Sequence, residues 1–146
     1  MNREIFNEDN IQLGLVSESK GDAILRAGEL LRKNGYVRSE YLEGMTKREE
    51  SLTTYVGNGV AIPHGLPEYI QYIQKSGLVM LQYPEGIDFG EGNIAYVLIG
   101  IAGKDDEHLE LLSTIALVCQ EEDNVTKLKQ AASKQEILEI LSGGDA

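Results

Sequence analysis

The chain of 146 residues lacks several features that mark large classes of protein. It has one cysteine, Cys119, so no disulfide can form within the chain, and a reducing compartment fits this composition. Its apolar runs are far shorter than the stretch of about 20 residues that a membrane span needs. Its first residues contain no apolar core and no small-residue cleavage site of a signal peptide. These absences predict a cytoplasmic protein that does not insert into a membrane.

Positive charge is also scarce. Lysine and arginine together number 13 and aspartate and glutamate 24, so the formal net charge is −11. An acidic surface repels phosphate backbones and anionic headgroups, which argues against nucleic acid and membrane surfaces as partners and favours a basic protein surface. The chain has no internal repeat and no linker, and its length suits a domain of about 100–150 residues. A single domain over residues 1–146 is therefore expected.

Hydrophobic spacing predicts helices toward both ends of the chain. Ser19 and Asp22 form the pattern of a capping box before the first helix, and Gly35 ends that helix. Apolar residues recur at helical spacing from residue 40 to about residue 50. A longer helix is expected after residues 105–106, and two shorter helices follow it. The longer helix is expected to bury one face made of Leu109, Leu112, Ile115, Ala116 and Cys119.

The middle of the chain predicts a β-sheet. Residues 53–62 have an extended pattern with a turn at residues 57–59. Residues 77–83 form a predicted strand that ends at Pro84, and residues 94–102 form another. The last two segments are almost continuously apolar, which indicates burial on both faces of the sheet. The predicted fold class is therefore α/β, with a mixed β-sheet sandwiched between helices in one domain.

The first of only two histidines lies at a predicted junction between a strand and a helix. An apolar strand runs into Pro63-His64-Gly65, and Pro67 then opens a short helix. Such junctions at a sheet edge are where α/β proteins place their chemistry, and the amides of a new helix favour anions. A functional role for His64 is one interpretation, and an ordinary loop histidine is the other.

The second histidine, His108, lies in the first turn of the longer helix. Imidazole is nucleophilic and titrates near neutrality, so one ring could accept a group while the other stabilises its negative charge. The acidic residues before His108 favour a protonated ring, whereas the helix dipole favours a neutral, donating ring. A solvated surface histidine is the alternative to either role.

Arg48 follows a lysine and precedes two glutamates near the end of the second predicted helix. Its guanidinium could bind a phosphoryl group through two donors, or it could be one charge on a solvated face. Gly57 and Gly59 are not followed by the residues of a dinucleotide-binding or P-loop motif. Two histidines and one cysteine give no metal-ligand spacing, so neither a metal nor a cofactor is expected. Cys119 precedes a run of acidic side chains, which disfavour a thiolate, and is expected in the core.

Residues 48–65 resemble the signature of enzyme IIA proteins of the mannitol/fructose class, from the bacterial phosphoenolpyruvate-dependent sugar phosphotransferase system. The core of this signature is Gly57-Asn58-Gly59-Val60-Ala61-Ile62-Pro63-His64-Gly65. Residues 82–90, 99–102 and 107–108 are similar to the mannitol branch in particular. The resemblance extends over residues 11–141.

This resemblance implies a phosphoryl carrier with a mixed sheet flanked by helices. A histidine phosphocarrier protein would phosphorylate His64 on Nε2, and His64 would pass the group to a cysteine of a IIB component. The sugar taken up and phosphorylated would be mannitol or a related sugar alcohol or hexose. His108 matches the family's second active-site histidine, and Arg48 matches its phosphate-steadying arginine. The chain contains no IIB or transmembrane region, so a free-standing component or an excised domain is expected.

Two other classes share these residues. A regulatory phosphoacceptor of the nitrogen-related IIA branch, or a IIA-like domain of a transcription regulator, would keep the histidine but signal by binding partners. A binding module would keep the fold and have lost transfer. Residues 82–86 favour the mannitol branch over the regulatory one. The presence of His64, His108 and Arg48 together argues against a module without transfer.

Overall fold

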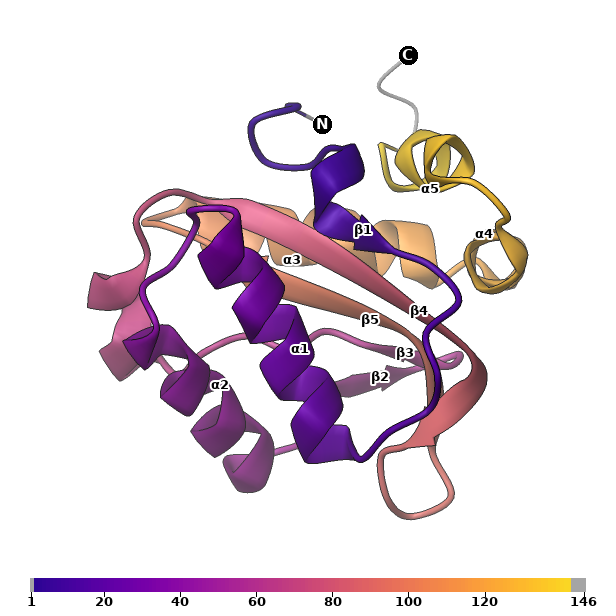
Figure 1. The fold of residues 1–146 in the computed structure, drawn as a ribbon, viewed down its shortest axis with the longest axis horizontal. Coiled ribbons are helices and arrows are strands. Elements are labelled where there is room, and N and C mark those ends of the chain that lie inside the picture. The colour runs from indigo at the N-terminus through magenta and orange to yellow at the C-terminus, as the bar shows by residue number, and fades with distance from the viewer. Residues whose placement is uncertain (1, 143–146) are drawn as a thin grey trace.

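A mixed five-stranded sheet runs through the computed structural model, which describes residues 2–142 (Figure 1). Its strands lie side by side in the order β1-β4-β5-β3-β2. The pairs β1/β4 and β3/β5 are parallel, and the pairs β4/β5 and β2/β3 are antiparallel. The strand bounds are β1 (Ile11–Gln12), β2 (Tyr55–Gly57), β3 (Val60–Ala61), β4 (Gly77–Asp88) and β5 (Ile94–Ala102).

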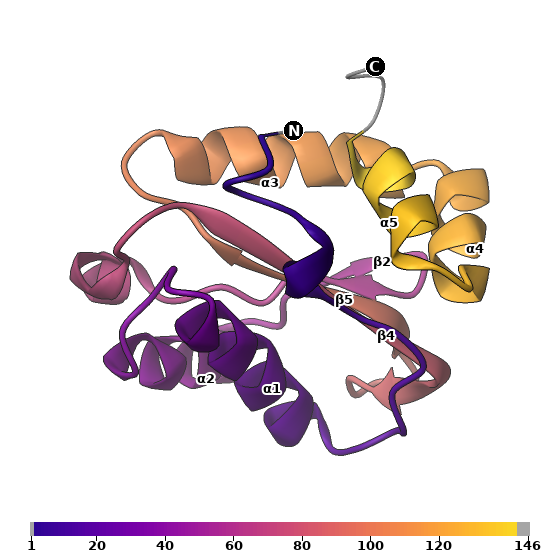
Figure 2. The same cartoon turned by 45° about the horizontal axis from the view of Figure 1, so that its top comes forward.

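Helices cover both faces of this sheet, which confirms the predicted α/β sandwich. Figure 2 shows α1 and α2 on one side of the strands and α3, α4 and α5 on the other. Each face has its own cluster of buried apolar side chains. No helix within residues 2–142 is both long and apolar enough to span a membrane. The helices are α1 (Lys20–Lys33), α2 (Glu40–Ser51), α3 (Glu107–Cys119), α4 (Glu122–Gln130) and α5 (Lys134–Leu141), with 3-10 turns at Glu8–Asn10 and Pro67–Tyr72.

Local sequence signals place the start and end of α1 as predicted. The Ser19 hydroxyl accepts a hydrogen bond from the Asp22 amide at 3.1 Å, which satisfies one of the free donors of the first turn. Gly35 follows the C-cap with a φ of 84°, a conformation that glycine adopts without steric cost. The predicted second helix is also confirmed, as α2.

The prediction that Pro84 ends its strand is wrong, because β4 continues to Asp88. The pairing of β4 with β5 shifts register between Gln82 and Ile87, so Pro84 lies in an irregular stretch of the ladder. Proline lacks an amide proton, and a bulge is one of the few places in a sheet that tolerates this loss.

The predicted buried face of α3 is only partly correct. Ile115 and Cys119 are buried, but Ala116 is exposed and Leu109 is 71% exposed. The helix instead buries Leu111 and Val118 together with Ile115 and Cys119. Most positions of α3 from Leu109 onward are apolar, so more than one stripe satisfies helical spacing, and docking against the sheet selects among them.

Candidate active site

The two histidines, far apart in the sequence, lie beside each other at one edge of the sheet. Their ring centroids are 5.2 Å apart, and their planes are inclined by 58°. His64 follows β3, and His108 follows β5 in the first turn of α3. Since β3 and β5 are parallel neighbours, their carboxyl ends meet at the same edge. The structure therefore places both junctions between strand and helix next to each other, as one candidate site.

A single hydrogen bond determines the tautomer of His64. Its Nδ1 atom lies 2.7 Å from the carbonyl oxygen of Ile62. A carbonyl oxygen can only accept a hydrogen bond, so Nδ1 carries the proton of the neutral ring. The lone pair then resides on Nε2. The geometry thus supports Nε2, rather than Nδ1, as the nucleophilic atom of the ring.

The backbone around His64 is held from two directions. The Ile101 amide of β5 donates to the Pro63 carbonyl at 2.9 Å. From α2, the Tyr41 hydroxyl accepts from the Gly65 amide at 2.8 Å and donates to the Ile101 carbonyl at 3.1 Å. Burial raises the pKa of Tyr41 to about 12, so this hydroxyl stays protonated. Both residues that flank His64 are therefore tied to neighbouring elements.

Tyr41 also explains why glycine follows His64. A Cβ atom at Gly65 would come within 2.6 Å of the Tyr41 ring, closer than side-chain atoms approach one another. The requirement is for close packing, because Gly65 does not have a positive φ. No sequence signal indicated the hydrogen bonds that Tyr41 makes beside His64.

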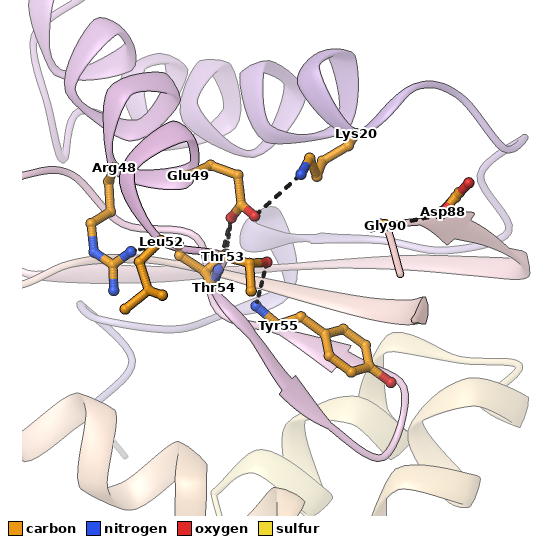
Figure 3. A network of polar contacts seen from close by, with 9 residues as sticks. All are labelled: Lys20, Arg48, Glu49, Leu52, Thr53, Thr54, Tyr55, Asp88 and Gly90. Atoms are coloured by element: carbon orange, nitrogen blue, oxygen red, sulfur yellow. Dashed lines mark hydrogen bonds and ion pairs between the residues drawn. The ribbon is translucent and has the colours of Figure 1, made fainter. Parts of the chain in front are cut away.

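Arg48 lies near the C-terminal end of α2 and lines the same pocket as both histidines. Its Nη1 atom donates to the Leu52 carbonyl, as Figure 3 shows. The structure therefore brings together all three residues that the sequence singled out. Apolar side chains line the pocket as well, and among them Ile70 is 45% exposed and Leu109 is 71% exposed.

The environment of the two rings favours their neutral forms. Burial is the main cause that lowers the pKa of His64, and the positive charges of His108 and Arg48 lower it further. The Ile62 carbonyl and the Glu49 carboxylate oppose this shift. Burial also lowers the pKa of His108. Of the two states expected for His108, the structure thus favours the neutral, donating ring.

We expect both histidines to titrate below the value of about 6.5 that is usual for a free imidazole. A depressed pKa means that each ring stays neutral as the pH falls through 6.5 and becomes protonated only at lower pH. NMR titration of the ring C–H signals measures this directly, and His64→Ala assigns the remaining signal to His108. The urea-unfolded chain, in which both rings are solvated, is the control. A midpoint above 6.5 for His108 would show that the neighbouring acidic residues dominate.

Cys119 takes no part in this site. Its side chain is buried at the end of α3, and burial raises the pKa of its thiol to about 11. A thiol with this pKa is protonated at neutral pH and is a poor nucleophile. The prediction that Cys119 is a core residue is confirmed.

Comparisons with known proteins agree on one family. Residues 4–143 match the family model for the phosphoenolpyruvate-dependent sugar phosphotransferase system, EIIA 2. The mannitol-specific phosphotransferase enzyme IIA component of Geobacillus stearothermophilus is 48% identical over 142 residues, which cover 97% of this chain and 98% of that protein. The crystal structure of IIA mannitol from Escherichia coli has a TM-score of 0.87 at 39% identity, with 93% of this chain and 98% of that chain covered.

Two further structures are informative about partners and about the regulatory branch. The complex of enzyme IIAMtl and phosphorylated enzyme IIBMtl from Escherichia coli matches with a TM-score of 0.90 at 38% identity, and the match covers 94% of this chain and 97% of that chain. Nitrogen regulatory protein IIA-Ntr from Neisseria meningitidis matches with a TM-score of 0.81 at 26% identity, over 94% and 97% of the two chains. The fold is common to both branches, but the sequence is more similar to the mannitol proteins.

Proposed function

The chain belongs to the EIIA 2 family of the phosphoenolpyruvate-dependent sugar phosphotransferase system, and we propose that His64 is its phosphoryl acceptor in the uptake of mannitol. The observation that carries this proposal is the hydrogen bond from His64 Nδ1 to the Ile62 carbonyl, which leaves Nε2 with its lone pair beside His108. As a member of this family the chain is a phosphotransferase component. We also propose that residues 1–146 form one IIA domain that works in the cytoplasm.

In the first step, His64 receives the phosphoryl group from a histidine phosphocarrier protein. A bond forms between His64 Nε2 and phosphorus, and the bond between phosphorus and the donor nitrogen breaks. The electron pair of the broken bond returns to the donor imidazole. The phosphorylated His64 ring then carries a positive charge, which strengthens the hydrogen bond from Nδ1 to the Ile62 carbonyl.

Arg48 and His108 supply the charge stabilisation that phosphoryl transfer requires. The guanidinium presents several donors in a planar fork, which matches the oxygens of a phosphoryl group. A neutral His108 ring can donate one N–H to another of these oxygens. Phosphoryl transfer depends chiefly on positioning and electrostatic stabilisation, and these two side chains line the pocket that contains His64.

In the second step, the group passes from His64 to a cysteine of a IIB component. A bond forms between sulfur and phosphorus, the bond to His64 Nε2 breaks, and the electron pair returns to the imidazole. Ile70 and Leu109 offer exposed apolar contacts around the pocket for both partners. The net charge of −11 favours a phosphocarrier with a basic face.

A screen of IIB partners tests both the transfer and the sugar. We expect the phosphorylated chain to pass its phosphoryl group more rapidly to a mannitol IIB protein than to a fructose IIB protein. The reason is the similarity to mannitol-specific IIA components, one of which is 48% identical over 97% of this chain. The measurement is single-turnover loss of the phosphohistidine.

The outcomes of this screen separate the alternatives. A IIB protein with its cysteine replaced by serine is the control for transfer to sulfur. Faster transfer to the fructose protein would contradict the mannitol assignment. A phosphorylated chain that is stable toward every IIB protein would instead favour the regulatory branch.

A further inference from the structure

A buried carboxylate, Glu49, follows Arg48 near the end of α2. Glu49 is 7% exposed, and its Oε1 atom accepts hydrogen bonds from the Thr54 amide at 2.9 Å and the Thr54 hydroxyl at 2.6 Å. Its Oε2 atom lies 3.6 Å from the Lys20 ammonium and has no hydrogen-bond partner among residues 2–142. Figure 3 shows the carboxylate between Lys20 on one side and Thr54 on the other.

The contacts of Glu49 continue through the backbone to the reactive ring. The Thr54 carbonyl accepts a hydrogen bond from the Ile62 amide at 2.9 Å. The Ile62 carbonyl in turn accepts from His64 Nδ1 at 2.7 Å. The peptide groups of Thr54 and Ile62 therefore connect the Glu49 carboxylate to the imidazole of His64.

We infer that Glu49 is a positioning residue for His64. It acts through Thr54 and Ile62 to hold the ring with its proton on Nδ1 and its lone pair on Nε2, and its negative charge acts on the same ring. This inference rests on the proposed role of His64 as phosphoryl acceptor. Neither sequence spacing nor the family resemblance assigns a role to Glu49.

The hydrogen bonds between Glu49 and Thr54 also order the segment that contacts Arg48. The Arg48 guanidinium donates to the Leu52 carbonyl, and Leu52 lies between Glu49 and Thr54 in the chain. When Glu49 fixes Thr54, it therefore also restricts the turn that leads from α2 to β2. Glu49 thus supports both the acceptor ring and the guanidinium fork.

A structural role alone does not account for a charged side chain at position 49. Burial of a carboxylate costs free energy unless the charge is compensated, and its ion-pair contact is to a partly exposed lysine at 3.6 Å. A neutral amide oxygen could accept the same two hydrogen bonds from Thr54. The negative charge of Glu49, however, raises the pKa of His64 against the effects of burial, His108 and Arg48. It thereby preserves the basicity of Nε2.

The ring nitrogens of His64 provide a direct test in the unphosphorylated chain. Nitrogen-15 NMR at pH 8 distinguishes a protonated ring nitrogen from a bare one. We expect Nδ1–H almost exclusively in the wild type and a mixture of both tautomers in Glu49→Ala, because the Ile62 carbonyl loses its support. Glu49→Gln keeps an oxygen acceptor for Thr54 and should restore the wild-type tautomer.

Charge is tested separately by titration. Glu49→Gln should lower the pKa of His64, because it removes a negative charge and leaves the geometry. The other titratable groups that line the His64 pocket are Arg48, His108, Asp105 and Tyr41, and all remain in this variant. Glu50→Ala, which removes the exposed neighbouring carboxylate of α2, is the matched control and should change neither readout.

The results decide the inference whatever the outcome of phosphorylation assays. Wild-type tautomer proportions in a folded Glu49→Ala would overturn it. If Glu49→Ala fails to fold, an unchanged His64 pKa in Glu49→Gln would overturn it, and a lowered pKa would support it. Because both readouts use the unphosphorylated chain, they stay valid even if His64 accepts no phosphoryl group. Where it does, Glu49→Ala should slow acceptance about 10²-fold, the typical cost of a reacting group misplaced by about 1 Å.

Discussion

Replacement of His64 with alanine is expected to abolish phosphorylation of this chain. His64 is the ring whose tautomer is set by the Ile62 carbonyl, so that Nε2 presents its lone pair. The test is incubation with phosphoenolpyruvate, the first enzyme of the pathway and the histidine phosphocarrier protein. The wild type should gain one acid-labile, base-stable phosphate, mapped to His64 by mass spectrometry. His64→Ala should gain none.

His108 provides the matched comparison, because it is the only other histidine and lies 5.2 Å away between ring centroids. His108→Ala should still accept one phosphoryl group on His64. Denaturant unfolding of both variants shows whether each is folded under the assay conditions. Equal labelling of His64→Ala, or phosphate mapped to His108 in the wild type, would contradict the assignment of the acceptor.

Loss of Arg48 or His108 is expected to slow transfer to the IIB cysteine by about 10²–10³-fold each, the usual effect of one lost donor to a developing charge. Both side chains line the pocket of His64, where they can donate to a phosphoryl group that His64 carries. The measurement is single-turnover transfer from the phosphorylated variant to a mannitol IIB protein, by rapid quenching.

Two controls on α2 make this prediction specific. Arg48→Lys keeps the charge but loses the planar fork, so it should recover only part of the rate. Lys47→Ala removes an exposed cation that pairs with Glu43 at 3.4 Å, and its rate should match the wild type. Transfer at the wild-type rate by His108→Ala would show that the second ring has no part in charge stabilisation.

The sequence by itself determined the fold class, the bounds of several elements and the three residues of the candidate site. The start of α1 could be predicted because Ser19 and the helix it caps are adjacent in the chain. The strand at residues 94–102 was predicted with its observed bounds, since a continuous apolar run directly reports burial on both faces. The segment from Arg48 to His64 is contiguous, so its resemblance to one family could be recognised without a structure.

Only the tertiary structure decided which contacts these residues make. The approach of His64 to His108 depends on the parallel pairing of β3 with β5, which joins segments far apart in the chain. Spacing could not choose among the apolar stripes of α3, and it could not show that Pro84 falls where the pairing of β4 with β5 shifts register.

The role of Glu49 also depends on the tertiary structure. The hydrogen bond from the Ile62 amide to the Thr54 carbonyl joins the segments of β2 and β3, and only this contact connects Glu49 to the peptide that binds His64 Nδ1. In the sequence, Glu49 is one acid in a run of charges that is typical of a solvated helix face. Folding buries it, and burial turns an ordinary surface charge into a group whose position and field act on the ring of His64.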